Sequence, residues 1–334
     1  MDYLAAAWIS IIAFCILMYV LLDGFTLGMG IILPFIGKDR QHRHLLFSAV
    51  LPTWDGNQTW LVLSGASLYG AFPLAFSMIL PTLYFPLFIM LIALLFRGVV
   101  FEFRLKSKGS ETDKWDYLFV FACVVATFMQ GLVIGTFVNG FVGSVKDMII
   151  PAYNWLTPFS VFTGISLVFG YALLGATRMI IKTQHELQDR LYIIAKSALF
   201  CVWIALLIIS LWTPFIDEHT KNKWFHSGHT AELAILPFIT TLAFIACALG
   251  LFFKKEHLPY WTAVIIFCCT SFGFGYSMWP YIVPHIVTVW QAASSHGSLV
   301  FMTIGACIML PVLLFYTWYS YHIFRGKVTD ALEY

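Results

Sequence analysis

The segment PTWDGNQTWL, residues 52–61, places one carboxylate and two carboxamides between two tryptophans, at the start of an apolar run. Polar groups of this kind are expensive inside a bilayer. The chain as a whole is unusually apolar, with 60% hydrophobic residues, 11% charged residues and a mean hydropathy of +0.84. Soluble domains carry about 25% charged residues. The composition therefore predicts an integral membrane protein.

Nine apolar windows in the sequence are near or above the ~20 residues that cross a bilayer as a helix. We expect an all-α membrane protein, a single polytopic domain over residues 1–334. Its nine spanning helices are expected to form two four-helix bundles and one peripheral helix. The windows are residues 4–36, 54–71, 74–101, 117–142, 155–180, 195–216, 231–253, 260–283 and 297–324.

The basic residues are divided unequally between the two sets of loops that these windows leave. Sixteen of the nineteen lysines and arginines fall on one side, and only Lys146, Lys221 and Lys223 fall on the other. The positive-inside rule then predicts a periplasmic N-terminus and a cytoplasmic C-terminus. The first window lacks a basic n-region and is too long for a cleavable signal peptide. This topology puts residues 52–61 at the cytoplasmic face.

Two acidic residues, Asp23 and Asp55, fall in or at the edge of apolar windows rather than in loops, termini or other helix ends. Carboxylates in such positions are candidates for function because they are expensive to insert. Asp23 is predicted either to line a proton relay or to be a neutral carboxyl that hydrogen-bonds a neighbouring helix. The sequence leaves both alternatives open.

Asp55 is expected in the first turn of a helix, where the helix dipole favours a negative charge. There it shares a face with Gln58 and Thr59, at spacings of three and four residues. Helix capping alone would explain Asp55. It would not explain why further polar residues follow at once.

Asn57, Gln58 and Thr59 extend the polar cluster toward the membrane interior. Trp54 and Trp60 flank it and suit a membrane interface, where the ring is apolar and the indole N–H is polar. We interpret Asp55 and these three residues as a strip that water and protons enter from the cytoplasm.

Arg97, Glu102 and Arg104 form a third charged cluster at the cytoplasmic end of the window 74–101. The arginines are candidates to hold a carboxylate such as Asp55 ionised, or to pair with Glu102. The alternative is that they are basic residues that mark a helix end by reaching toward the headgroups.

The ten histidines do not lie in the middle of any apolar window, where axial haem ligands would be needed. His226 and His229 could bind a metal, but a loop without nearby cysteines makes a solvated pair the simpler interpretation. We therefore predict no metal and no redox centre on this chain, and no catalytic triad or nucleic-acid partner.

Several segments, in order along the whole chain, resemble subunit II of the cytochrome bd quinol oxidases. The polar block at residues 54–61 is the most specific of them. The matching segments are Leu22–Phe25, Trp54–Leu61, Phe96–Arg104, Met278–Tyr281, Trp290–Ser295 and Leu313–Trp318.

The resemblance implies a heterodimer in the bacterial inner membrane that reduces O₂ to water with electrons from quinol, without pumping protons. Subunit I would carry a low-spin haem b, a high-spin haem b and haem d, while this chain would be haem-free and stabilise its partner. Asp55 would open a cytoplasmic proton path, and Asp23 would belong to a motif of unsettled role. Small single-helix accessory subunits, membrane lipids and a structural quinone accompany some members.

The chain departs from the family pattern at two positions. Gly98 stands where some members have proline, and Gln291 where some have an acidic residue. Membership of the cyanide-insensitive branch stays open. A polytopic secondary transporter, also a helical bundle broken by glycine and proline, is the alternative from another class. A purely structural assembly subunit is a third.

Overall fold

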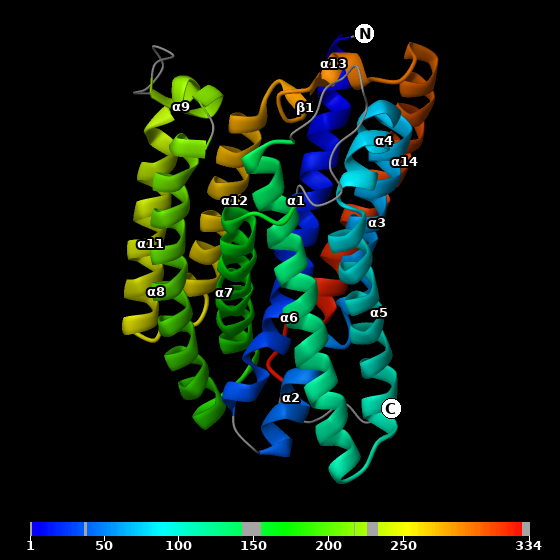
Figure 1. Cartoon of the computed structure of the whole chain (residues 1–334). Coiled ribbons are helices and arrows are strands. Elements are labelled where there is room, and N and C mark those ends of the chain that lie inside the picture. The colour runs from blue at the N-terminus through cyan, green and yellow to red at the C-terminus, as the bar shows by residue number, and fades with distance from the viewer. Residues whose placement is uncertain (1, 37–38, 142–154, 217, 226–232, 329–334) are drawn as a thin grey trace.

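The computed structural model describes residues 2–36, 39–141, 155–216, 218–225 and 233–328 of the chain. Long helices form an elongated bundle in which their axes run roughly side by side (Figure 1). The short helix α2 lies at one end of the bundle. The strand β1 and the helix α13 lie at the opposite end, where α1 begins (Figure 1).

The elements of the described residues follow in chain order. They are α1 (Asp2–Ile32), the 3₁₀ helix η1 (Leu33–Ile36), α2 (Arg40–Val50), α3 (Trp54–Ala71), α4 (Pro73–Thr82), α5 (Tyr84–Lys106), α6 (Ser110–Asn139), α7 (Pro158–Lys182), α8 (His185–Ile216), α9 (Glu218–Phe225), α11 (Ile235–Phe252), α12 (Leu258–Met278), β1 (Tyr281–Val283), β2 (Val287–Thr288), α13 (Val289–Ala292) and α14 (His296–Ile323).

In the part of the chain that the structure describes, eight helices are long and apolar enough to cross a membrane. They confirm an all-helical multi-pass architecture. The predicted window 54–71 coincides with α3, which is 18 residues long but is not one of the eight. The polar residues in the first turns of α3 lower its mean hydropathy, which explains why it is not among the eight candidate membrane-spanning helices.

The predicted window 74–101 is two helices, α4 and α5, rather than one continuous helix. Leu83 separates them, with a backbone conformation outside the helical range (φ −101°, ψ 15°). Pro86 follows in the first turn of α5, where its missing N–H would have had no helical partner. The sequence prediction of a single unbroken window was wrong at this point.

The helix α1 is in the centre of the bundle, with α3, α6 and α7 packed around it. The contact with α7 brings the two backbones together: a Cβ atom on Gly28 would lie 1.8 Å from the carbonyl oxygen of Tyr171. On the opposing helix, a Cβ on Gly175 would lie 2.3 Å from the carbonyl carbon of Gly28. Both positions require glycine, because any side chain would separate the helices.

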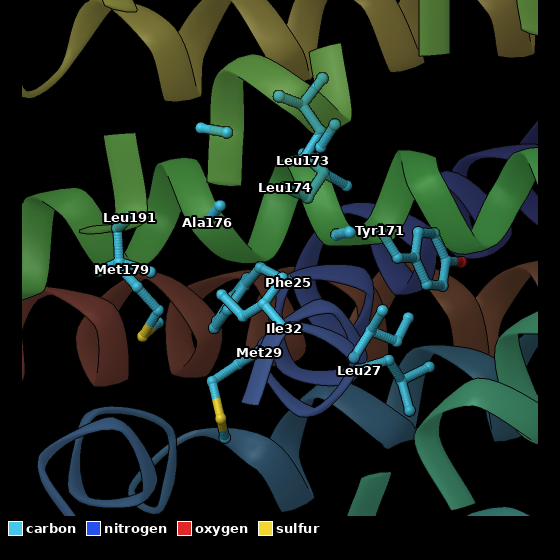
Figure 2. Close-up of a cluster of buried hydrophobic side chains, with 14 of the residues drawn as sticks. Phe25, Leu27, Met29, Ile32, Tyr171, Leu173, Leu174, Ala176, Met179 and Leu191 are labelled. Carbon is cyan, nitrogen blue, oxygen red and sulfur yellow. The ribbon is translucent and has the colours of Figure 1, made fainter. Parts of the chain in front are cut away.

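Apolar side chains continue this contact on both sides of the glycines. Figure 2 shows Phe25, Leu27, Met29 and Ile32 of α1 in the same buried cluster as side chains of α7, among them Met179. All are nearly or completely buried, in a core that extends to α5, α6, α8, α11 and α12. The α1–α7 contact therefore organises the interior of the bundle.

The last helix, α14, packs much more loosely. Of its residues only Leu299 is buried. Hydrogen bonds hold it against the bundle. The indole of Trp8 donates to the hydroxyl of Thr303 at 3.1 Å, the indole of Trp60 donates to that of Thr317 at 3.3 Å, and the hydroxyl of Tyr321 donates to Asn57 at 2.9 Å. Most of its apolar surface is left for lipid or for another chain.

The segment that follows α14 is anchored at the end of the bundle where α7 ends. The Lys182 ammonium donates to the carbonyl oxygens of Phe324 and Gly326. The ammonium of Lys327 contacts the Glu256 carboxylate at 2.6 Å, and Gln188 donates to the same carboxylate at 2.9 Å. These contacts satisfy carbonyls at the C-terminal end of α14 and hold the segment in place.

We predict that Gly28→Ala lowers the free energy of unfolding by about 1–3 kcal/mol. The added methyl group would overlap the backbone of α7, so α1 would have to move. Thermal unfolding of the purified protein measures this effect. Gly275→Ala is the matched control, because a Cβ on Gly275 meets no atom within 4 Å. An equal loss of stability in both variants would contradict the prediction.

Glu256 predicts a dependence of stability on pH. Hydrogen bonds from Lys327 and Gln188 lower the pKa of this carboxyl below its ordinary 4.5. A lowered pKa in the folded state stabilises the fold above about 4.5 and loses that effect as pH falls through the folded-state pKa. Melting temperatures measured between pH 7 and pH 3 should therefore fall more steeply for the natural protein than for Glu256→Gln. Parallel curves of melting temperature against pH for the two proteins would show that the contacts of Glu256 do not contribute to the pH dependence of stability.

Candidate functional site

Asp23 and Arg97 form an ion pair inside the bundle. A nitrogen of the guanidinium, Nη2, donates to the Oδ2 atom of Asp23 at 2.9 Å, and both side chains are 0% exposed. Arg97 comes from α5 and Asp23 from the middle of α1. The sequence left open whether Asp23 lines a proton relay or is a neutral carboxyl that bonds a neighbouring helix, and the structure adds a guanidinium as its partner. The structure also corrects the expected pairing of Arg97 with Asp55 or Glu102.

The guanidinium of Arg97 also faces the indole of Trp54, with 5.5 Å between its central carbon and the ring centroid. Trp54 in turn stacks on Phe101 with a centroid distance of 4.8 Å. Trp54 is the first residue of α3. The beginning of α3 is therefore fixed against α5, directly beside the buried ion pair.

Asn57 lies on the buried side of α3 and joins three helices. Its amide nitrogen donates to the carbonyl oxygen of Leu22 at 2.9 Å and to the hydroxyl of Thr26 at 3.4 Å. The hydroxyl of Tyr321 on α14 donates to the Asn57 carbonyl at 2.9 Å. Asn57, which the sequence placed in a strip that water and protons enter, is 2% exposed, and its hydrogen bonds fix the position of α3.

Trp60 has a similar role on the same side of α3. Its side chain is 1% exposed, and its indole nitrogen reaches Thr317. The sequence suggested a tryptophan at the membrane interface, and the structure shows that the ring packs against α1 and α14 within the bundle.

Asp55, Gln58 and Thr59 lie together on the other side of α3. Asp55 and Thr59 are exposed and Gln58 is half-buried, as their spacing predicts. Among the described residues, no ion pair engages Asp55. Its position in the first turn places it where the helix dipole stabilises a carboxylate. This face leaves a carboxylate open to exchange protons with its surroundings.

Glu102 and Arg104 do not pair with each other. Arg104 is buried and its Nε atom donates to Asp116 at 2.5 Å, while Arg43 contacts the same carboxylate at 2.8 Å. The guanidinium of Arg104 also lies 3.8 Å from the ring centroid of Phe47. Glu102 is exposed. Arg104 therefore joins α2, α5 and α6 at the end of the bundle and has no contact with Asp55.

A buried chain of three polar side chains was not predicted from the sequence. The amide nitrogen of Gln130 donates to the Tyr19 hydroxyl at 2.8 Å, and the hydroxyl of Tyr171 donates to the amide oxygen of Gln130 at 2.8 Å. Tyr19 is one helical turn before Asp23 on α1. That spacing was the only signal in the sequence, since an isolated tyrosine or glutamine in an apolar window is common.

In the part of the chain that the structure describes, no three His, Cys, Asp or Glu side chains come together in a way that could hold a metal ion. His226 and His229, for which the sequence allowed a metal site, lie outside the described residues.

We predict that Asp23→Asn and Arg97→Met each lower the free energy of unfolding by about 3–5 kcal/mol, because each leaves one buried charge without its partner. The double variant should lose less than the sum of the two single losses. Denaturant or thermal unfolding of the purified protein provides all the required values.

The surface pair of Glu186 and Arg190 is the matched control. Its oxygen–nitrogen distance is 2.6 Å, but the side chains are 67% and 42% exposed. Glu186→Gln should change stability by less than about 1 kcal/mol. Additive losses at Asp23 and Arg97 would show that the two charges do not depend on each other.

Comparison of the sequence with known proteins identifies the family of this chain. The family model for cytochrome bd terminal oxidase subunit II matches residues 4–324. Subunit 2 of the cytochrome bd-I ubiquinol oxidase of Escherichia coli (strain K12) is 25% identical over 365 residues, which cover 98% of this chain and 96% of that protein. Subunit 2 of the cytochrome bd ubiquinol oxidase of Bacillus subtilis (strain 168) is 27% identical over 335 residues, which cover 96% of each chain.

The fold also resembles a solved structure. A chain of the bd oxidase from Geobacillus thermodenitrificans superposes with a TM-score of 0.79, at 15% identity, over 96% of this chain and 98% of that one. At this level of identity the likeness shows the fold alone. The family model, however, spans almost the whole sequence, and the protein therefore belongs to the cytochrome bd terminal oxidase subunit II family.

Proposed function

We propose that this chain is the second subunit of a quinol oxidase that reduces O₂ to water, and that it supplies the cytoplasmic start of a proton-uptake path at Asp55. The observation that carries the proposal is the division of α3 into two faces. One face is fixed inside the bundle by Asn57 and Trp60. The other presents Asp55 and Thr59 at the surface.

The proposal includes the topology that the basic residues predict. We propose that α3 is a ninth crossing in a single membrane domain, with the N-terminus periplasmic and the C-terminus cytoplasmic. In support, successive long helices alternate in direction, and α14 ends toward the end of the bundle that holds α2 (Figure 1). The loosely packed α14 would be the peripheral helix beside two four-helix bundles. Asp55 then faces the cytoplasm.

The packing around Asp55 supports a role that needs a fixed position. Trp54, which precedes it, is held between Phe101 and the guanidinium of Arg97. Glu102 follows Phe101 directly and is also exposed. Asp55 and Glu102 are thus exposed carboxyl groups that each come directly after an aromatic residue in the sequence, and the rings of those two aromatic residues stack on each other. A proton acceptor held in one place on a rigid helix can deliver protons to one route.

Asp23 has a different role in this proposal. Because it is fully buried and paired with Arg97, it links α1 to the side chain of a residue on α5 behind the proposed uptake site. No contact of Asp23 or Asn57 leads to the exposed face of α3 in the described chain. The path therefore begins with Asp55, Gln58 and Thr59 and continues into the partner.

The partner in this family is subunit I, to which we assign the two b haems and haem d, with no haem on this chain. Those haems supply the electron transfer and the oxygen reduction. If that reaction takes protons from the cytoplasm while quinol releases protons on the periplasmic side, charge is separated without a pump. We propose that lipid, subunit I and any single-helix accessory subunits cover the exposed apolar surface.

Family membership argues against the transporter that composition alone allowed. A purely structural subunit remains the second candidate, because Asp23, Arg97, Asn57 and Arg104 all serve packing. The two candidates differ at Asp55, which has no described partner to lose.

We predict that Asp55→Asn slows quinol-driven O₂ consumption by on the order of tenfold or more, since an amide cannot carry the proton. The assembled complex should still contain all of its haems, because Asp55 is exposed and its replacement disturbs no buried contact. Oxygen uptake and the reduced-minus-oxidised spectrum of the purified complex measure the two effects.

Glu111→Gln is the control. Glu111 is likewise exposed and lies in the first turn of a helix, α6. It should leave turnover unchanged. Normal turnover in Asp55→Asn would exclude Asp55 from the proton path and favour the structural subunit. Loss of the haem spectra would assign Asp55 a role in assembly.

A further inference from the structure

A groove lies on the outside of α5 and α6, close to the turn that joins these two helices. Its volume is about 550 Å³, which is within the ~300–1,000 Å³ of sites that bind small molecules. Arg43 of α2 contacts Asp113 and Asp116 of α6, so the groove lies at the end of the bundle that holds α2 (Figure 1). None of its lining residues belongs to α3, and the groove is therefore separate from the site at Asp55.

The part of the groove farther from the turn is aromatic and apolar. Phe103 of α5 and Trp115 of α6 stack with 5.2 Å between the ring centroids, and we call them the aromatic pair. Leu118 continues the lining one turn further along α6. On the same helix faces, Phe96 and Phe121 are 44% and 66% exposed. An apolar surface therefore leads from the groove toward the middle of the bundle.

The part of the groove nearer the turn is charged. Lys106 is the last residue of α5, and Lys114 lies in the second turn of α6; we call them the lysine pair. Glu111 also lines the groove. All three side chains are exposed, and no ion pair engages them among the residues that the structure describes. The lining thus has a net positive charge.

Arginines at the same end of the bundle differ from the lysine pair, because the protein supplies their counter-charges. Arg40 and Arg43 contact the Asp113 carboxylate at 2.6 Å and 3.0 Å. The charge of the lysine pair is left for a group from outside the chain. Basic side chains beside a membrane surface attract anionic lipids, and the chain is a multi-pass membrane protein.

We propose that this groove binds one anionic phospholipid, whose phosphate contacts the lysine pair and whose acyl chain follows the aromatic pair and Leu118. The order of the side chains matches the order of the parts of such a lipid. The charged residues are nearest the end of the bundle, the aromatic rings come next, and the apolar residues are deepest. The site requires only that the chain spans a membrane, and it does not depend on proton uptake at Asp55.

The lining argues against other occupants. Lysine and glutamate are depleted at protein–protein interfaces, so a helix of another subunit fits this groove poorly. A zwitterionic phospholipid has no net charge to complement the lysine pair. A free phosphate ion would complement the charge, but it would leave the aromatic pair and Leu118 in contact with water.

Native mass spectrometry of the purified complex in a neutral detergent tests the site, with phosphatidylglycerol as the probe. The double variant Lys106→Gln, Lys114→Gln should bind this site on the order of tenfold more weakly, because both charges that contact the phosphate are lost. At lipid concentrations that fill the tight sites of the natural complex, the variant should therefore bind one molecule fewer. An unchanged number of bound molecules would overturn the proposal.

The double variant Lys108→Gln, Lys255→Gln is the matched control. It removes the same total charge from exposed lysines that do not line the groove. We expect it to bind as many phosphatidylglycerol molecules as the natural complex, and a loss equal to that of the groove variant would overturn the proposal. Both double variants change only exposed side chains, so their haem spectra and melting temperatures without added lipid should stay those of the natural complex.

Two further probes separate the sources of the phosphate. Phosphatidylcholine should bind the natural complex and the groove variant in equal numbers, and a loss of one molecule in the variant would show that the site does not select anionic lipid. Inorganic phosphate should not displace the bound phosphatidylglycerol, and its displacement would assign the groove to a free anion. A cryo-electron microscopy map gives the direct test. Headgroup density is expected beside the lysine pair, and a helix of another subunit in the groove would refute the proposal.

Discussion

The interior of this subunit depends on one ion pair. Asp23 of α1 and Arg97 of α5 are completely buried, and neither could remain charged in an apolar bundle without the other. The pair fixes the central helix against α5, while the glycine contact fixes it against α7. The guanidinium then holds Trp54, the first residue of α3. The position of the proposed proton-uptake site thus follows from a charge that is not itself exposed.

The two carboxylates that looked similar in the sequence occupy opposite environments. Asp23 is sealed inside the bundle, and Asp55 is exposed on the far side of α3. Asn57 separates them, since its side chain points inward and ties α3 to α1 and α14. One helix turn therefore contains both a structural polar group and a group free to exchange protons.

Hydropathy, charge distribution and short motifs were sufficient to predict the helical membrane fold and the family. They also predicted that Asp55, Gln58 and Thr59 share a face, because helical spacing alone determines this. They could not predict which charged side chains pair with each other. Glu102 is the charged residue nearest to Arg97 in the sequence, and only packing shows that Arg97 reaches Asp23 instead. The pairing of Arg104 with Asp116 was missed for the same reason, because it depends on a contact between helices.

Asp23 and Arg97 are 74 positions apart in the sequence, and this separation has a consequence for biosynthesis. At 5–20 residues per second, the ribosome needs about 4–15 s to make that length of chain. During this interval α1 is available to the membrane while its counter-charge does not yet exist. The free-energy cost of inserting Asp23 is lowest if its carboxyl enters the membrane in the neutral, protonated form. The carboxyl then gives up its proton when α5 docks and supplies Arg97. Maturation of the nascent subunit would then release a proton at a defined step.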